Sequence, residues 1–326
     1  MALGFVSSSL PGCDEMISRI LFDAHRRTVS DGTNLFLGLR PMKKGLIEEY
    51  NGEEINFHAG NGAQINGVHF KGTEPKAIIF LHGNGCFYET SGMKPIVWRE
   101  ALKRDENIPH LLLFNPRGTG ESSGITQTHY VIEDFMIMFE YLVNECHVNP
   151  NHIAIGGHSM GGYFGLFGAA AIQQRYPTAK INFISDRSLW DLRSRVALSV
   201  ESAGYSGLSA SIATTLISSI ISSPNWTRDS AKALESLKGR VFIIYHPKDG
   251  VILYKDSTHQ GLLNIERVKE YFCLELSEED RHAEIGSYPH NREFTDCENQ
   301  KIVAELRRML EIPPTSMDES LPVLMP

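Results

Sequence analysis

The chain has 326 residues, of which 42% are hydrophobic, 21% charged and 9% aromatic. This composition excludes a disordered, a collagen-like and a disulfide-scaffold protein, and the length allows one large α/β domain or two smaller ones. Lysine and arginine total 31 against 39 aspartates and glutamates, a net charge of −8. Because the cations are nowhere concentrated, the sequence argues against nucleic-acid binding.

The five cysteines are scattered and form no C-x-x-C pair, so the sequence offers neither a zinc ribbon nor a thioredoxin motif. Scattered thiols fit a reducing compartment. The first ten residues lack the basic and apolar regions of a secretory signal, and no run reaches the roughly 18–20 apolar residues of a membrane span. We therefore expect a cytoplasmic protein, with export by a signal-less route, such as that of a pathogen effector, left open.

Short apolar runs alternate with helical stretches along the chain, which is the pattern of a mostly parallel sheet flanked by helices. Helices are expected at 14–27, 91–103, 128–146, 160–175 and 298–310. Strands are expected at 64–71, 76–81, 110–115, 152–156, 180–185, 240–246 and 268–276.

No Pro/Gly/Ser-rich linker divides the chain, which favours one core domain carrying an insertion. We expect an N-terminal extension with the first helix or strand over 1–60, a domain over 61–311 with a helical cap at about 188–238, and a disordered tail over 312–326.

The segment Gly157-His158-Ser159-Met160-Gly161 fits G-x-S-x-G, with an apolar strand before it and a small-residue helix after it. A serine on such a sharp strand-to-helix turn is held in a strained conformation that exposes its hydroxyl. Side chains two positions away on either side would collide with the turn, so glycine is needed there. The helix N-terminus also directs free N–H groups toward a developing oxyanion. Ser159 is therefore the candidate nucleophile.

With this motif the chain resembles the α/β-hydrolase superfamily, from about residue 64 to 310. His82-Gly83-Asn84-Gly85 is similar to the oxyanion loop of that superfamily, and 115–124 to its Arg-Gly-x-Gly-x-Ser loop. The chain looks most like the intracellular serine hydrolases that include protein depalmitoylases, with similar chains in intracellular bacterial pathogens. The resemblance implies an oxyanion hole made of the Asn84 and Met160 N–H groups, while His82 holds the loop.

A serine nucleophile needs a base that a carboxylate orients, and the superfamily order is Ser, acid, His. Asp249 follows the strand after the cap and is the expected acid, with Asp186 as the alternative. His290 is the expected base because Pro289-His290-Asn291 resembles the His-Asn pair of depalmitoylase-like relatives, and His282 is the alternative.

The cap carries an apolar stripe, Leu208, Ile212, Leu216 and Ile220, with Ala213, Ile217 and Ile221 beside it. It either packs over the core or forms a lid over an acyl pocket that could touch a membrane, although the basic face of an interfacial helix is missing. No dinucleotide loop, H-E-x-x-H or tight His/Asp cluster is evident, so no cofactor and no metal are expected.

Together these features predict a serine hydrolase of the α/β-hydrolase fold that cleaves a carboxylic ester or thioester of a small-molecule or lipid substrate. A non-catalytic binding module on the same fold, an acyltransferase and a peptidase are the alternatives. The acyl chain, the leaving group and the oligomeric state are left open.

Overall fold

The computed structural model describes residues 12–265, 271–277 and 289–313. Its centre is a sheet of eight strands in the order β1-β2-β4-β3-β5-β6-β7-β8. β1 and β2 pair antiparallel, as do β2 and β4, and every pairing from β4 to β8 is parallel. The strands are β1 (Gly52–His58), β2 (Gln64–Phe70), β3 (Ala77–Leu81), β4 (His110–Phe114), β5 (Ile153–His158), β6 (Asn182–Asp186), β7 (Val241–Tyr245) and β8 (Tyr271–Glu275).

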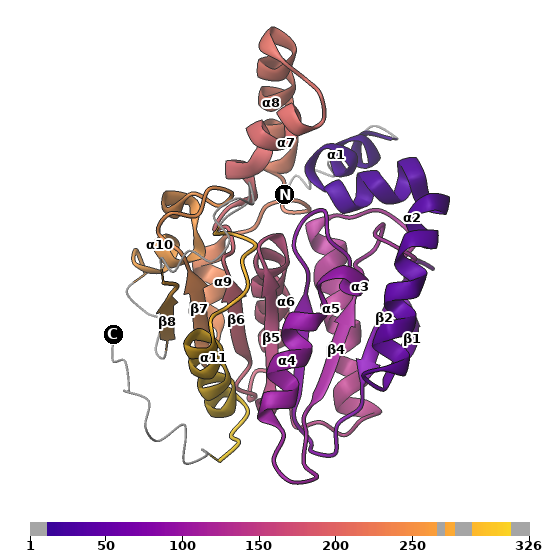
Figure 1. Cartoon of the computed structure of the whole chain (residues 1–326). Helices are drawn as coiled ribbons and strands as arrows, with labels where there is room; N and C mark the ends of the chain where they lie inside the picture. The colour runs from indigo at the N-terminus through magenta and orange to yellow at the C-terminus, as the bar shows by residue number, and fades with distance from the viewer. Residues whose placement is uncertain (1–11, 266–270, 278–288, 314–326) are drawn as a thin grey trace, which may run out of the picture.

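Helices cover both faces of the sheet (Figure 1). Alternate residues of β3 contribute to two separate cores, one on each face of the sheet. Ile79 belongs to the core shared with α5 (Thr128–Asn144) and α6 (Met160–Arg175). Ile78 belongs to the core shared with α4 (Met93–Leu102) and α11 (Asp296–Met309) on the other face. Strands buried on both faces explain the continuous apolar runs in the sequence.

The expected strands are all found, with ends shifted by one or two residues; the last is described only from Tyr271 onward, because 268–270 lie outside the described residues. The helix expected at 91–103 is divided at Gly92 into α3 (Tyr88–Ser91) and α4. The tail beyond residue 313, expected to be disordered, also lies outside the described part of the chain.

Two N-terminal elements go beyond the prediction. The helix expected at 14–27 is instead α1 (Cys13–Leu21) followed by α2 (Asp23–Glu48), which contains Pro41 and a non-helical residue at Asp31. The internal glycines and proline weaken the helical pattern of α2 in the sequence. β1 was missed because it is an edge strand with only Gly52 and Ile55 buried.

The insertion between β6 and β7 contains α7 (Val196–Ser202), α8 (Gly207–Ile221) and α9 (Ser230–Ser236). In Figure 1, α7 and α8 rise above the sheet beside α1. Helix α8 packs through Ile217 and Ile221, which are 3% and 0% exposed. Of the expected stripe, Ile220 packs against the core, whereas Leu208, Ile212 and Leu216 are 77%, 53% and 59% exposed. Within the described residues, no helix is long and apolar enough to cross a membrane.

Candidate active site

Ser159 lies between the end of β5 and the start of α6, with φ +53°, in the region that L-residues rarely adopt. Tight packing makes glycine necessary on both sides of this turn. A Cβ on Gly157 would lie 2.4 Å from the Leu81 carbonyl oxygen, and one on Gly161 would lie 2.3 Å from the same atom. The Ser159 N–H donates to the Asp186 carbonyl at 2.8 Å, which fixes the turn against β6. The strained elbow expected from the motif is therefore present.

The loop after β3 lies against this serine. A Cβ on Gly83 would lie 3.3 Å from the Ser159 Cβ, so the loop and the nucleophile approach as closely as glycine allows. His82 donates from Nδ1 to the Gly83 carbonyl at 2.9 Å, and burial lowers the pKa of His82 to about 4. These contacts fit the expected role of His82 in holding the loop.

Asn84 is tied to the N-terminal helices by its side chain. Its Oδ1 accepts from the Asp23 N–H at 2.8 Å, and its Nδ2 donates to the Leu21 carbonyl at 3.1 Å. A cavity of about 20 Å³ is lined by Asn84 and Met160 among others. Such a volume accommodates roughly one water-sized atom. The structure thus brings the two expected oxyanion donors to one small cavity, and the α1–α2 junction, which the sequence did not reveal, braces one of them.

Asp249 and His290 meet at the same end of the sheet. His290 donates from Nδ1 to Asp249 Oδ2 at 2.7 Å, and both side chains are buried. The other carboxylate oxygen, Oδ1, accepts from the Val251 and Ile252 N–H groups at 2.8 and 2.9 Å. Burial raises the pKa of Asp249, but the hydrogen bond and charge interaction with His290 and these two N–H donors outweigh it, so the pKa is lowered. Asp249 therefore stays ionised beside the imidazole, whose Nε2 remains to exchange a proton.

The expected base, His290, lies beside the elbow: the centre of its ring is 4.8 Å from that of His158, the residue before Ser159. Asp186, the alternative acid, makes different contacts: its carboxylate binds Arg187 and His158. The alternative base His282 lies outside the described residues.

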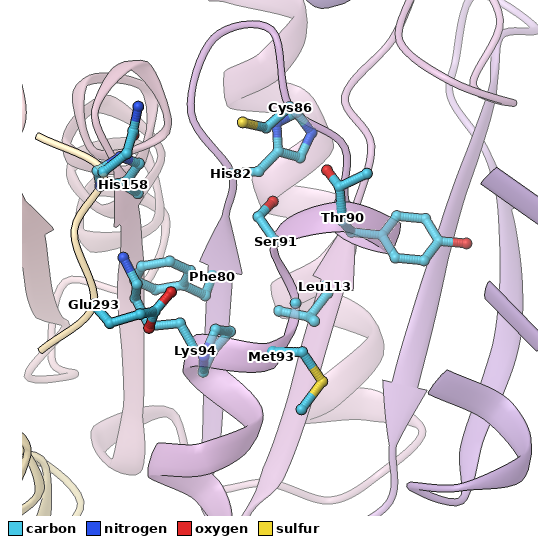
Figure 2. Close-up of a pocket in the computed structure, with 14 residues that line it drawn as sticks. Phe80, His82, Cys86, Thr90, Ser91, Met93, Lys94, Leu113, His158 and Glu293 are labelled. Atoms are coloured by element: carbon cyan, nitrogen blue, oxygen red, sulfur yellow. The ribbon is translucent and has the colours of Figure 1, made fainter. Parts of the chain in front are cut away.

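A pocket of about 240 Å³ opens next to His158 on the α4 face of the sheet (Figure 2). Its lining is largely apolar, with Phe80, Met93 and Leu113 from three separate elements. Lys94 lies on this lining, 3.5 Å from Asp186, and burial lowers its pKa although Asp186 opposes that shift. The pocket thus offers apolar surface beside the elbow, together with the charged side chains of Lys94 and Glu293.

One side-chain cluster departs from the sequence expectation. The metal-binding atoms of His69, His110 and Cys146 lie within 4.8 Å of one another, although no tight cluster was evident from the sequence. The two imidazoles bind each other at 2.8 Å, and His69 also contacts the Tyr141 hydroxyl at 3.0 Å. His69 lies on β2, His110 on β4 and Cys146 just after α5. Because only the folding of the sheet brings them together, their spacing in the sequence does not indicate a cluster.

Known proteins share this architecture. The sequence model of the alpha/beta hydrolase fold matches residues 76–177. Over 128 residues the chain is 30% identical to the multifunctional-autoprocessing repeats-in-toxin of Vibrio cholerae, covering 36% of this chain and 3% of that protein. Over 114 residues it is 27% identical to the uncharacterized protein YfhR of Salmonella typhimurium, covering 34% of this chain and 38% of that protein. The chain therefore spans well under two thirds of these relatives.

Solved structures agree over more of the chain. An alpha-beta hydrolase from Vibrio vulnificus superposes with a TM-score of 0.58 at 18% identity, covering 82% of this chain and 87% of that one. An esterase from Pyrococcus furiosus gives a TM-score of 0.52 at 13% identity, covering 70% and 81%. Acetyl xylan esterase 1 from a Thermoanaerobacterium species gives 0.54 at 14%, covering 81% and 84%. The expected α/β-hydrolase fold is thereby confirmed.

Proposed function

We propose that this protein is a serine hydrolase that cleaves a carboxylic ester or thioester through Ser159, His290 and Asp249. The observation that carries the proposal is the buried 2.7 Å bond between Asp249 and His290 beside the strained Ser159 elbow. A carboxylate bound to Nδ1 fixes the tautomer in which Nε2 can accept the serine proton. The esterases of similar fold support the same class of reaction.

The reaction follows from these roles. Ser159 Oγ attacks the acyl carbonyl carbon while its proton passes to His290 Nε2, and Asp249 stabilises the resulting imidazolium. The N–H groups of Asn84 and Met160 bind the oxyanion. The imidazolium then protonates the leaving alkoxide or thiolate, which leaves an acyl ester on Ser159. Water, deprotonated by His290, attacks this ester. The imidazolium returns the proton to Ser159 Oγ as the bond between Oγ and the acyl carbon breaks, and the carboxylic acid departs. Each oxyanion donor contributes about 10²–10³ in rate.

The substrate class follows from the surroundings of the elbow. The pocket of about 240 Å³ next to His158 has an apolar lining that suits an acyl or other hydrocarbon group. The exposed apolar side chains of Leu208, Ile212 and Leu216 on α8 lie on the inserted cap, and they offer a second apolar surface for a long acyl chain or a membrane bearing it. An acyl substrate, as ester or depalmitoylase-type thioester, is therefore part of the proposal.

A chain-length series of p-nitrophenyl esters, together with one acyl thioester, tests this function. Ser159→Ala should lower turnover by about 10⁴–10⁶ without unfolding the protein. Ser185→Ala is the matched control, because Ser185 is a buried serine at the end of the neighbouring strand whose hydroxyl has no hydrogen-bond partner among the residues that the structure describes. Turnover that survives in Ser159→Ala, or that falls equally in both variants, contradicts the proposal.

Two other outcomes point to the alternatives. Folded protein that hydrolyses none of these compounds and resists a fluorophosphonate favours a non-catalytic binding module on the same fold. Labelling of Ser159 without ester turnover, followed by acyl transfer to an added alcohol or amine or by peptide cleavage, favours an acyltransferase or a peptidase.

A further inference from the structure

Asp186 connects the nucleophile turn to its surroundings. It is the last residue of β6 and is paired in register with His158 of β5. Its carbonyl accepts from the Ser159 N–H, while its fully buried carboxylate accepts from Arg187 Nε at 2.7 Å and from His158 Nδ1 at 2.9 Å. One residue thus contacts the nucleophile through its backbone and two neighbours through its side chain.

Those two neighbours reach the segment that carries His290. Arg187 Nη1 donates to the Pro289 carbonyl at 3.0 Å and to the Arg292 carbonyl at 3.1 Å. His158 Nε2 lies 3.1 Å from the side-chain amide of Asn291, whose NH2 group donates to the neutral imidazole when the amide takes its flipped orientation. Four consecutive residues, 289–292, are therefore each held by a hydrogen bond, and His290 itself is held by Asp249.

We propose that Asp186, Arg187 and His158 form a clamp that positions His290 against Ser159. The inference rests on the function proposed above and adds to it three positioning residues, none of which touches the reacting atoms in that mechanism. Asp186 is thus assigned a role other than that of triad acid.

The local structure supports a dedicated arrangement. Arg187 has φ +47°, a conformation that non-glycine residues rarely adopt, and its side chain is fully buried. Its charge is compensated by Asp186, with which it makes two hydrogen bonds of 2.7 and 3.1 Å. The guanidinium also lies 4.8 Å from the ring centre of Phe294, just beyond the clamped segment. A planar group with five donors can bind a carboxylate and two carbonyls at once, which lysine cannot do.

Arg187→Ala removes the two bonds that bracket His290. We expect kcat on a p-nitrophenyl ester to fall about 10- to 100-fold with KM nearly unchanged, because misplacement of a base by about 1 Å has that effect. Guanidinium ion added to the buffer should restore part of kcat in Arg187→Ala only. His158→Phe, which keeps a ring beside His290 but loses both hydrogen bonds, should give a smaller loss.

Arg99→Ala is the matched control. Arg99 is also buried, and it also donates to two carbonyls, those of Pro109 and Lys71, and to one carboxylate, that of Glu100. It lies on α4, among residues that flank β4 at its amino end, and it makes none of the contacts to 289–292. Its loss should lower stability with kcat per folded molecule unchanged.

A measurement that needs no turnover separates the clamp from the function. The proton that His290 donates to Asp249 should give a far-downfield NMR signal in the wild-type protein, absent in His290→Gln. We expect this signal to persist in Arg99→Ala and to broaden or vanish in Arg187→Ala. An intact signal and unchanged kcat in folded Arg187→Ala overturn the clamp. If the wild type proves inactive, the proposed function fails, and the NMR comparison alone decides whether Arg187 positions His290.

Discussion

The carboxyl edge of the sheet and helix α8 place their side chains in opposite environments. At the edge, the carboxylate of Asp186 is buried against the guanidinium of Arg187, and that of Asp249 against the imidazole of His290. On α8, the apolar Leu208 and Leu216 face outward. Buried charges are costly unless paired, so the edge is an arrangement that stability alone does not favour. Both regions therefore depart from the usual burial pattern, the edge by burying ionisable side chains and α8 by exposing apolar ones.

The hydroxyl groups of α8 strengthen this contrast. Thr215 donates to the Ser211 carbonyl at 2.9 Å, and Ser222 donates to the Ser218 carbonyl at 2.8 Å. A hydroxyl bonded within its own helix has less need of water. Hence the serines and threonines of α8 are compatible with apolar surroundings, as its leucines are.

The strongest test of the edge compares two histidines. His290→Ala should lower esterase turnover by about 10⁴–10⁶, because it removes the proposed base, while His282→Ala should keep most of the activity. Steady-state rates of the two purified variants measure the difference. A reversed result leaves the serine nucleophile in place but moves the base to His282.

The proposed role of Asp249 as the acid of the triad is tested by removing its negative charge. Asp249→Asn keeps the shape of the side chain but no longer favours the productive tautomer, so kcat should fall on the order of 10³–10⁴. Steady-state rates of purified Asp249→Asn, compared with those of the wild type, measure the loss. Activity of Asp249→Asn within tenfold of wild type would show that another carboxylate orients His290.

The two faces of α8 should respond differently to substitution. Ile221 is 0% exposed, so Ile221→Ala should lower the free energy of unfolding by about 2–5 kcal/mol. Ile212 is 53% exposed, so Ile212→Ser should change the free energy of unfolding by no more than about 0.5 kcal/mol. Urea unfolding measures both. If α8 contacts the acyl chain, Ile212→Ser should also slow the hydrolysis of long-chain esters more than that of acetate esters. Equal slowing of both would show that α8 does not contact the acyl chain.

The smallest effect concerns acid stability. Burial lowers the pKa of His110 and of His158 from 6.5 to about 4. The unfolded chain thus binds these protons at higher pH than the folded protein, so stability is full above pH 6.5 and falls as the pH drops toward 4. His110→Gln should reduce that fall by on the order of 1–3 kcal/mol. Urea titrations at pH 7 and at about 4.5 measure it, and an unchanged difference contradicts the assignment.

The sequence predicts the core of this fold well, because central strands such as β3 and β4 are continuous apolar runs and α6 follows a recognisable elbow. The N-terminal region is predicted poorly: β1 has few buried residues, and α2 contains glycines and a proline that local propensity counts against helix. Tertiary contacts decide those elements.

For the site, motif and chain order lead to Ser159, Asp249 and His290. They do not lead to Arg187 or to the bracing of Asn84 by Leu21 and Asp23, because those contacts join segments far apart in the chain. His158 stands at the variable position of the motif, where the pattern gives no information. The orientation of α8 was equally hidden, since a stripe of apolar residues predicts one buried face without showing which residues it comprises.

The central claim is that Ser159 is an activated nucleophile, and one labelling experiment tests it most directly. Wild-type protein, His290→Ala and the control Ser185→Ala are treated with a fluorophosphonate and digested, and the modified peptide is identified by mass spectrometry. We predict one phosphonyl group per chain, on Ser159, in wild type and Ser185→Ala, and labelling at least a hundredfold slower in His290→Ala. Folded wild-type protein that stays unlabelled, or that is labelled on another residue, contradicts the account.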